Sequence, residues 1–559
     1  MRVGSGGFLP TEVCALASLR RGITVALLYV ALSAIPSAPQ PVSDPSSHVT
    51  IDERIESMSG DERIAQLMFV SSYGNAGADP EIARWRVGGV VLYAHNLSTV
   101  AHIRRLTAAI RGAGGPDYPP FIAIDQEGGI VRRLYTGVPL VPSTMALGAA
   151  LSGDLARRAG FAVGAALRNL GFTMNFTPVL DVLPESGPAA LETRAFSNQP
   201  GLVADLGTAF FEGQRAAGII SVGKHFPGQG AAIEDTHSVL PILHLSRRDL
   251  DARDLLPFRL AIERGLPAMM TGHVALPRIT GKSDLPATLS AEVMTKILRK
   301  DLRFEGVVIS DALRMKPVSR LGSADTAAVQ AVLAGCDMVL VPGPPQHREQ
   351  VFDGLRRAYR DGTLTEGRLR ESLRRILTLK AVRFEHAATP PIEGDIAREV
   401  ARKAVTVIGD GRILTTALRE TLAYVGPTGA VQGGVRTGHT IILPGQFKES
   451  TRRRLREQTT AVLAKAAAWI AVAETDEQWR FIGETSASFP DLQLVYVNLG
   501  SPYRSVDGRR VVSVLTYSSS PQSQQAAADV VNGVMRATGV LPITLEPRTS
   551  SGASPDKRP

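Results

Sequence analysis

The chain has 559 residues, of which 44% are hydrophobic and 21% charged, so it exceeds one ordinary domain and is neither mostly disordered nor fibrous. Only two cysteines occur, Cys14 and Cys336, which excludes a disulfide framework, a cysteine-rich zinc site and a four-cysteine iron–sulfur cluster. The formal net charge of +9 is modest for this length and suits an anionic surface, but it is not a nucleic-acid signature.

The first segment of the chain has the pattern of an export signal. Arg20 and Arg21 precede an apolar run from Ile23 to Ile35, and small residues follow it. We therefore predict a signal peptide over residues 1–38, a Pro-rich linker over 39–51 and an exported, periplasmic or extracellular location. The run is shorter than the ~20 residues of an ordinary membrane span, so an integral membrane segment is expected only if the signal stays uncleaved as an anchor.

Eight short apolar runs, separated by amphipathic stretches, follow between residues 52 and 390. Continuous hydrophobicity is typical of parallel strands buried on both faces, which favours an α/β fold with a (β/α)8 TIM-type barrel. A doubly wound open sheet is the alternative, and the lack of a G-x-G-x-x-G string after any run disfavours its dinucleotide-binding version. The runs are Gln66–Val70, Gly89–Tyr93, Phe121–Asp125, Thr173–Thr177, Ile219–Lys224, Ala268–Gly272, Gly306–Ser310 and Asp337–Val341.

A second, smaller α/β unit, with an open sheet, is predicted over residues 391–547. It begins with a helical pattern over Ile396–Val407, and two further helical stretches cover Glu449–Ala467 and Ser523–Thr538. A polar tail over 548–559 is expected to be disordered. The predicted strands are Leu422–Val425, Thr440–Leu443, Ala468–Val472, Leu492–Val497 and Val511–Leu515.

Polar residues cluster where the predicted barrel strands end, at the edge that forms the active site of such barrels. An isolated example is more simply explained as a capping Asp or a hydrogen-bonded core His, but several at one edge indicate a site. Asp311 follows an apolar strand, so its carboxylate would reach the barrel mouth as a nucleophile, general base or metal ligand. The residues concerned are Asp125, Asn175, Asp181, Lys224, His225, His273 and Asp311.

The longest polar constellation follows the fifth predicted strand. Asp235 and His237 are two residues apart, so one loop can bring them together, with the carboxylate orienting an imidazole that shuttles protons near neutral pH. A polar surface loop is the simpler alternative. A metal site from Asp235, His237 and His225 is disfavoured by the charge of Lys224 and by the lack of an H-E-x-x-H spacing.

Taken together, these motifs resemble glycoside hydrolase family 3, specifically its β-N-acetylglucosaminidase (β-hexosaminidase) branch. The resemblance covers residues 50–385 in the family's order, and Gly539–Ile543 resembles the end of the family's C-terminal α/β sandwich. The matching strings are Ala123–Gly129, Asn175–Asp181, Lys224–Gly228, Asp235–His237, Ser310–Met315 and Ala334–Met338.

The resemblance implies a retaining double displacement, with Asp311 as nucleophile and the Asp235–His237 dyad in place of the usual second carboxylate, His237 acting as acid and then as base. It implies no metal and no organic cofactor, and it leaves the C-terminal domain without a catalytic residue. The implied substrate-binding residues are Asp125, Arg133, Arg194, Lys224, His225, His273 (as pocket wall or support) and Met315.

Three positions depart from the family pattern. Gln229 stands where a second His is frequent, Ala312 where a second Asp is frequent, and Ile130 where a basic residue is common, so the resemblance implies no particular contacts beyond the first sugar. The leading expectation is an exported enzyme that removes terminal GlcNAc from peptidoglycan- or chitin-derived fragments, with a carbohydrate and no nucleic acid as partner. The alternatives are a phosphorylase of the same family, a broad β-glucosidase and a catalytically weak wall-binding protein.

Overall fold

The computed structural model describes residues 49–74, 78–115, 117–185, 187–382, 394–417, 422–435 and 437–545. The predicted signal peptide, most of the linker and the C-terminal tail lie outside these ranges, as does the predicted domain boundary at residue 390.

Eight parallel strands form the first sheet, in the order β7-β6-β5-β4-β3-β2-β1-β8. A bridge between Ile309 and Met338 joins β7 to β8 and closes the ring. The sequence prediction of a (β/α)8 barrel is therefore confirmed, and the doubly wound alternative is wrong. The strands are β1 (Met68–Ser71), β2 (Gly89–Val91), β3 (Phe121–Ile124), β4 (Met174–Asn175), β5 (Ile220–Phe226), β6 (Ala268–Thr271), β7 (Val307–Ile309) and β8 (Val339–Val341).

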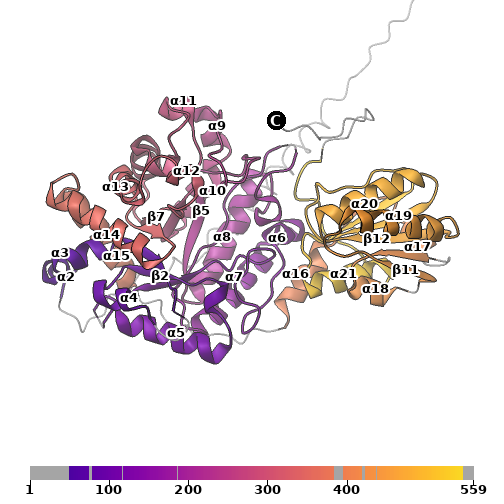
Figure 1. Ribbon diagram of the computed structural model, residues 1–559, viewed down its shortest axis with the longest axis horizontal. Coiled ribbons are helices and arrows are strands. Elements are labelled where there is room, and N and C mark those ends of the chain that lie inside the picture. The colour runs from indigo at the N-terminus through magenta and orange to yellow at the C-terminus, as the bar shows by residue number, and fades with distance from the viewer. Residues whose placement is uncertain are drawn as a thin grey trace, which may run out of the picture. The chain divides into compact units, whose positions relative to one another are not determined.

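Helices surround the barrel strands (Figure 1). Several start at a Ser or Thr whose hydroxyl accepts a backbone N–H of the first turn, as Thr99 and Ser152 do. Within the described ranges, no helix is both long and apolar enough to cross a membrane. The helices are α2 (Ile51–Ser57), α3 (Gly60–Ala65), α4 (Pro80–Trp85), α5 (Val100–Ala113), α6 (Thr144–Ala150), α7 (Gly153–Asn169), α8 (Pro200–Ala216), α9 (Arg247–Ala252), α10 (Leu255–Glu263), α11 (Pro277–Thr280), the π-helix η4 (Glu292–Asp301), α12 (Lys316–Ser319), α13 (Ala324–Ala334), α14 (Pro345–Arg360) and α15 (Glu366–Ala381), with 3-10 turns η1 (Ala94–Asn96), η2 (Glu192–Arg194) and η3 (Ala287–Leu289).

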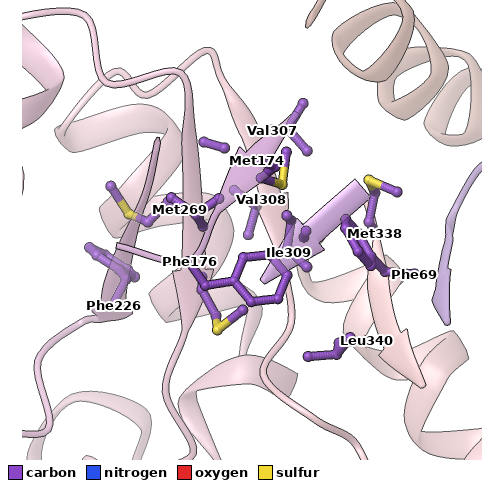
Figure 2. Close-up of a cluster of buried hydrophobic side chains, with 14 of the residues drawn as sticks. Phe69, Met174, Phe176, Phe226, Met269, Val307, Val308, Ile309, Met338 and Leu340 are labelled. Carbon is purple, nitrogen blue, oxygen red and sulfur yellow. The ribbon is translucent and has the colours of Figure 1, made fainter. Parts of the chain in front are cut away.

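Large apolar side chains from the strands fill the barrel interior (Figure 2). Phe69 and Phe176 meet edge to face with their ring centroids 5.5 Å apart, and Met174, Met269 and Met338 are fully buried. Burial of each such side chain contributes about 1.5–3 kcal/mol. The strands are apolar on both faces because one face meets this interior and the other meets the helices.

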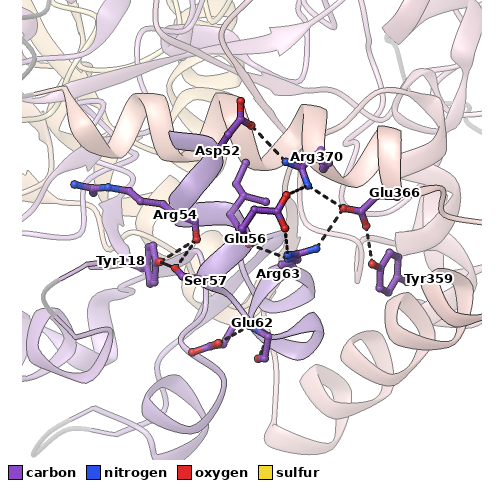
Figure 3. A network of polar contacts seen from close by, with 12 residues as sticks. Asp52, Arg54, Glu56, Ser57, Glu62, Arg63, Tyr118, Tyr359, Glu366 and Arg370 are labelled. Atoms are coloured by element: carbon purple, nitrogen blue, oxygen red, sulfur yellow. Dashed lines mark hydrogen bonds and ion pairs between the residues drawn. The ribbon is translucent and has the colours of Figure 1, made fainter. Parts of the chain in front are cut away.

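Helices α2 and α3 are joined to α15, the last barrel helix, by a network of ion pairs (Figure 3). Arg370 of α15 contacts Glu56 of α2 at 2.5 Å, and Arg63 of α3 reaches both Glu56 and Glu366. Exposed pairs contribute little singly, but these contacts tie the beginning of the barrel to its end.

The C-terminal domain contains an open six-stranded sheet in the order β11-β10-β12-β13-β14-β9. Helices α19 and α20 pack on one face and α18 and α21 on the other. The elements are α16 (Ile396–Ala404), β9 (Thr406–Gly409), α17 (Arg412–Ala417), β10 (Leu422–Gly426), α18 (Ala430–Gly434), β11 (His439–Ile442), α19 (Glu449–Leu463), β12 (Ala468–Ala473), α20 (Asp476–Ser488), β13 (Gln493–Asn498), β14 (Val511–Leu515) and α21 (Pro521–Val531).

The sequence prediction for this domain is confirmed for the sheet and its five parallel strands, but it is wrong at one point. The helix predicted over Ile396–Val407 ends at Ala404, and Thr406–Gly409 form β9, which pairs antiparallel with β14. The β-branched residues Val405 to Ile408 explain the change, because branching at Cβ favours the extended backbone over the helix.

Candidate active site

A cavity of ≈ 320 Å³ opens at the carboxyl ends of the barrel strands. It brings together most of the residues that the sequence singled out, but Asn175, Asp181, Asp235 and His273 are not among its lining residues. The lining residues are Tyr93, Asp125, Val131, Arg133, Phe176, Arg194, Lys224, His225, Gln229, Thr236, His237, Met270, Asp311, Ala312, Met315 and Leu340.

Asp311 lies two residues after the end of β7 and lines this cavity. Its backbone N–H donates to Thr271 Oγ1 at 3.2 Å, and its own Oδ1 accepts the Ala312 N–H at 2.7 Å. Burial raises the pKa of Asp311, but His273, His225 and the Ala312 N–H together outweigh burial and hold it below its usual value. The carboxylate is therefore ionised at neutral pH, as a nucleophile must be.

His273 does not line the cavity but supports the loop that carries Asp311. Its Nδ1 lies 2.8 Å from Thr288 Oγ1 and its Nε2 3.3 Å from the Ala312 carbonyl oxygen. Burial lowers the pKa of His273, against the opposing charge of Asp311. A carbonyl oxygen only accepts, so Nε2–H donates to it. Thr288 also contacts Thr271 at 2.7 Å. A continuous chain of hydrogen bonds thus fixes Asp311, and we assign His273 a positioning role.

Asp235 and His237 form the dyad that their spacing predicts. His237 Nδ1 lies 2.8 Å from Asp235 Oδ1, which also accepts the His237 backbone N–H at 2.9 Å. Burial raises the pKa of Asp235, but these hydrogen bonds bring it below its usual value, so Nδ1–H donates and Nε2 is left for proton transfer. Both side chains are more than half exposed, and His237 borders the cavity.

Opposite charges also meet at the cavity, around Lys224 and Arg194. Lys224, 2% exposed, contacts Asp125 Oδ1 at 2.8 Å and Glu127 Oε1 at 2.7 Å. Arg194 binds Glu127 with two hydrogen bonds, at 3.0 and 2.9 Å, and Arg133 lies 3.8 Å from Asp125. Burial raises the pKa of Glu127, yet Arg194 and Lys224 hold it far below its usual value. The network presents three cations, Arg133, Arg194 and Lys224, and the Asp125 carboxylate to the polar groups of a ligand.

Glu127→Gln is expected to unfold at lower denaturant and to lower kcat/KM. The change leaves two buried cations without their shared anion, a loss of about 3–5 kcal/mol in the free energy of unfolding. A misplaced Arg194 or Lys224 lowers kcat/KM about 100-fold. Denaturant unfolding and steady-state kinetics measure both effects, with the exposed Glu305→Gln as control. An unchanged kcat/KM in Glu127→Gln would contradict this role.

Asp181, which follows β4, anchors the segment that carries His225. Its Oδ2 accepts the His225 backbone N–H at 3.1 Å and lies 2.7 Å from His225 Nδ1, and its Oδ1 accepts the Gln229 N–H at 2.7 Å. Between these residues, Gly228 has φ +114° and lies so close to Asp254 that an added Cβ would approach the Asp254 Cβ within 2.8 Å. Only glycine fits this tight turn.

Asp254 is fully buried, and both its carboxyl oxygens have no hydrogen-bond partner in the part of the chain that the structure describes. Burial raises the pKa of Asp254 to about 7, against the nearby Arg253 and with the help of Asp181. The unfolded chain releases this proton near pH 4 and the folded chain only near pH 7, so the free energy of unfolding falls as the pH rises through this window.

Asp254→Asn is therefore expected to be more stable than the unsubstituted protein at pH 8, by at most about 4 kcal/mol. The difference should shrink as the pH falls toward 4, where the Asp254 carboxyl is neutral in the folded protein and begins to take up its proton in the unfolded chain as well. Thermal unfolding of the two proteins from pH 4 to pH 8 measures this trend. A stability difference that does not change with pH would contradict it.

Tyr93, Glu127, Thr271 and Thr288 belong to the site although the sequence did not single them out. Tyr93 follows β2 and lines the cavity, and burial together with the charges of Asp125 and Asp311 raises its pKa. Its position at the end of a strand could have indicated a site residue, but a Tyr at the end of an apolar run is predicted more simply to belong to the hydrophobic core. In the described ranges, no three His, Cys, Asp or Glu side chains are grouped so that they could hold a metal ion.

The cavity places an ionised carboxylate, Asp311, and a histidine that is hydrogen-bonded to an aspartate, His237, within one barrel mouth. Residues 59–379 match the model of the glycosyl hydrolase family 3 N-terminal domain. The chain belongs to glycosyl hydrolase family 3. It is a glycoside hydrolase, and the family resemblance predicted from the motifs is confirmed.

Relatives of this family 3 chain carry the name β-hexosaminidase. The Nitrosomonas eutropha protein of that name is 38% identical over 275 residues, which cover 48% of this chain and 77% of that protein. The β-hexosaminidase A of Pseudoalteromonas piscicida is 33% identical over 371 residues, 60% of this chain and 61% of that one. A solved family 3 β-N-acetylglucosaminidase from Paenibacillus sp. str. FPU-7 is 30% identical with a TM-score of 0.77, covering 87% of this chain and 99% of that chain.

Proposed function

We propose that this family 3 enzyme is an exported, retaining β-N-acetylglucosaminidase that removes terminal GlcNAc from peptidoglycan- or chitin-derived fragments. The observation that carries the proposal is that Asp311 and His237 border the same cavity, the first ionised and the second oriented by Asp235. The names of the relatives support the choice of sugar.

In the first step, the Asp311 carboxylate attacks the anomeric carbon and the bond from that carbon to the leaving oxygen breaks. The protonated His237 gives its Nε2 proton to the leaving oxygen while Nδ1–H remains bonded to Asp235. The products of this step are the free aglycone and a glycosyl ester on Asp311.

In the second step, water attacks the anomeric carbon of the ester, and the now neutral His237 takes the proton of that water. The Asp311 carboxylate leaves, and two inversions give net retention. A His in place of a second carboxylate avoids the repulsion that two carboxylates would feel at close range. Asp125, Arg133, Arg194, Lys224 and His225 hold the sugar's hydroxyl and acetamido groups through charge-assisted hydrogen bonds.

Turnover of 4-nitrophenyl β-N-acetylglucosaminide and of the matching glucoside, each with and without phosphate, tests this proposal. Preference for the acetamido sugar, with a rate independent of phosphate, is the expected result. Equal or faster turnover of the glucoside would favour a broad β-glucosidase. No turnover of either sugar would favour a wall-binding protein.

A phosphorylase is the second candidate, and the identity of the proton shuttle favours it. His237 carries no negative charge, so an anionic phosphate can approach the glycosyl ester where a carboxylate shuttle would repel it. In that case, added phosphate accelerates the reaction and GlcNAc 1-phosphate is the product.

Export is also part of this proposal. It rests on the sequence pattern of a signal peptide over residues 1–38, which lie outside the described residues. Expression of the full chain, followed by fractionation and N-terminal sequencing, tests it. Export with a new N-terminus near residue 39 supports a cleaved signal. An exported chain that keeps its first residues supports an anchor, and retention in the cytoplasm contradicts export.

A further inference from the structure

Arg314 lies in the loop that carries Asp311, at the rim of the cavity. Ala312 and Met315 on either side of it line the cavity, whereas Arg314 itself is exposed. Its side chain reaches across to Gly343, after β8, so closely that a Cβ there would lie 2.9 Å from Arg314 Nη1. Gly343 has φ +134°, and its missing side chain leaves the room that Arg314 occupies.

Further positive charge lies beside this arginine. Helix α14, of 16 residues, begins next to Gly343 with Pro344 at its N-cap, no side-chain cap and no acidic residue in its first turn. The start of a helix carries partial positive charge and favours acidic residues, yet the first turn here contains His347 and is followed by Arg348. Burial and then the charge of Arg314 lower the pKa of His347.

The acidic residues in this region, Asp79 and Glu81, form ion pairs with Arg348 and not with Arg314. Arg348 is 1% exposed and contacts Asp79 at 3.0 Å and Glu81 at 4.0 Å, while its Nε and Nη2 have no partner among the described residues. Within the same residues, no hydrogen bond or ion pair to Arg314 occurs. The rim therefore carries a cation without a counter-charge, next to the positive end of α14.

We propose that Arg314 determines specificity at the aglycone side of the cavity, where it binds a carboxylate on the leaving group of the substrate. This inference rests on the proposed glycosidase function. The sugar occupies the cavity, so its leaving group points out across the rim that carries Arg314. A guanidinium binds a carboxylate with two parallel hydrogen bonds, and the start of α14 adds to the attraction.

A pair of substrates that differ only in this charge tests the proposal. They are the 4-carboxyphenyl and the 4-carbamoylphenyl β-N-acetylglucosaminides, and the ratio of their kcat/KM values is the measured selectivity. Arg314→Gln is expected to lower this ratio about three- to fivefold, the range of an exposed ion pair. Comparison of the variant with the unsubstituted enzyme cancels the different reactivities of the two leaving groups.

Arg320→Gln is the matched control, because it removes the same charge from an exposed residue at the end of α12. The selectivity of this control should equal that of the unsubstituted enzyme, and the effect of Arg314→Gln should vanish in 1 M salt. An unchanged ratio in Arg314→Gln, or an equal fall in Arg320→Gln, would overturn the inference and leave the proposed function intact. Failure of the unsubstituted enzyme to cleave either substrate would overturn both.

Discussion

Asp311→Asn is expected to lower kcat for 4-nitrophenyl β-N-acetylglucosaminide by about 10⁴-fold or more, because the amide has the shape of the carboxylate but cannot form the glycosyl ester. The fold should survive, since the contact from Ala312 N–H to Asp311 Oδ1 can be kept by the amide oxygen. Steady-state kinetics, with thermal unfolding as a check on folding, measure the effect. The exposed Asp284→Asn is the matched control and should keep full activity.

Azide, a small external nucleophile, provides a second test of the role of Asp311. In Asp311→Ala, azide can occupy the place of the carboxylate and attack the anomeric carbon once, while the bond from that carbon to the glycosidic oxygen breaks and the 4-nitrophenolate leaves. One inversion should give the α-glycosyl azide, which nuclear magnetic resonance distinguishes from the β form. Activity of Asp311→Asn within tenfold of the unsubstituted enzyme, or a β-azide from Asp311→Ala, would rule out Asp311 as nucleophile.

The second large effect is expected at His237. His237→Gln removes both the acid of the first step and the base of the second, which should lower kcat/KM about 10²- to 10⁴-fold for a sugar leaving group. A 4-nitrophenyl leaving group needs no proton, so it should still leave quickly, and the glycosyl ester should then accumulate. A rapid burst of 4-nitrophenol followed by slow turnover is the expected time course.

The matched control for this prediction is the exposed His244→Gln, which should behave as the unsubstituted enzyme. If His237→Gln slowed 4-nitrophenyl and sugar leaving groups equally, without a burst, His237 would not be the proton shuttle. The Asp235–His237 hydrogen bond would then be a structural contact of an exposed loop.

The barrel could be predicted from the sequence because its strands are buried on both faces and so appear as uninterrupted apolar runs. β9 (Thr406–Gly409) could not, because its apolar residues continue the helical pattern of α16 without a break. It is an edge strand, and its last two residues are exposed. The change from helix to strand between Ala404 and Thr406 depends on pairing with β14, which is distant in the sequence.

The residues of the site also fall into two groups, those that a local sequence pattern predicts and those whose role depends on distant contacts. Asp311 and the Asp235–His237 pair were predictable because a strand end or a short spacing places them. Glu127 was not, since its importance comes from Arg194, 67 residues away, and from Lys224. The support of Asp311 by Thr271 and Thr288 likewise depends on contacts across the barrel that no local pattern records.

The most direct test of the account is to find the residue that carries the sugar during turnover. His237→Gln is mixed with excess 4-nitrophenyl β-N-acetylglucosaminide, quenched in acid during slow turnover, digested and analysed by peptide mass spectrometry. The account predicts one peptide, heavier by one GlcNAc residue, with the modification on Asp311. A modification on another residue would contradict Asp311 as nucleophile, and turnover without any modified peptide would contradict the covalent intermediate itself.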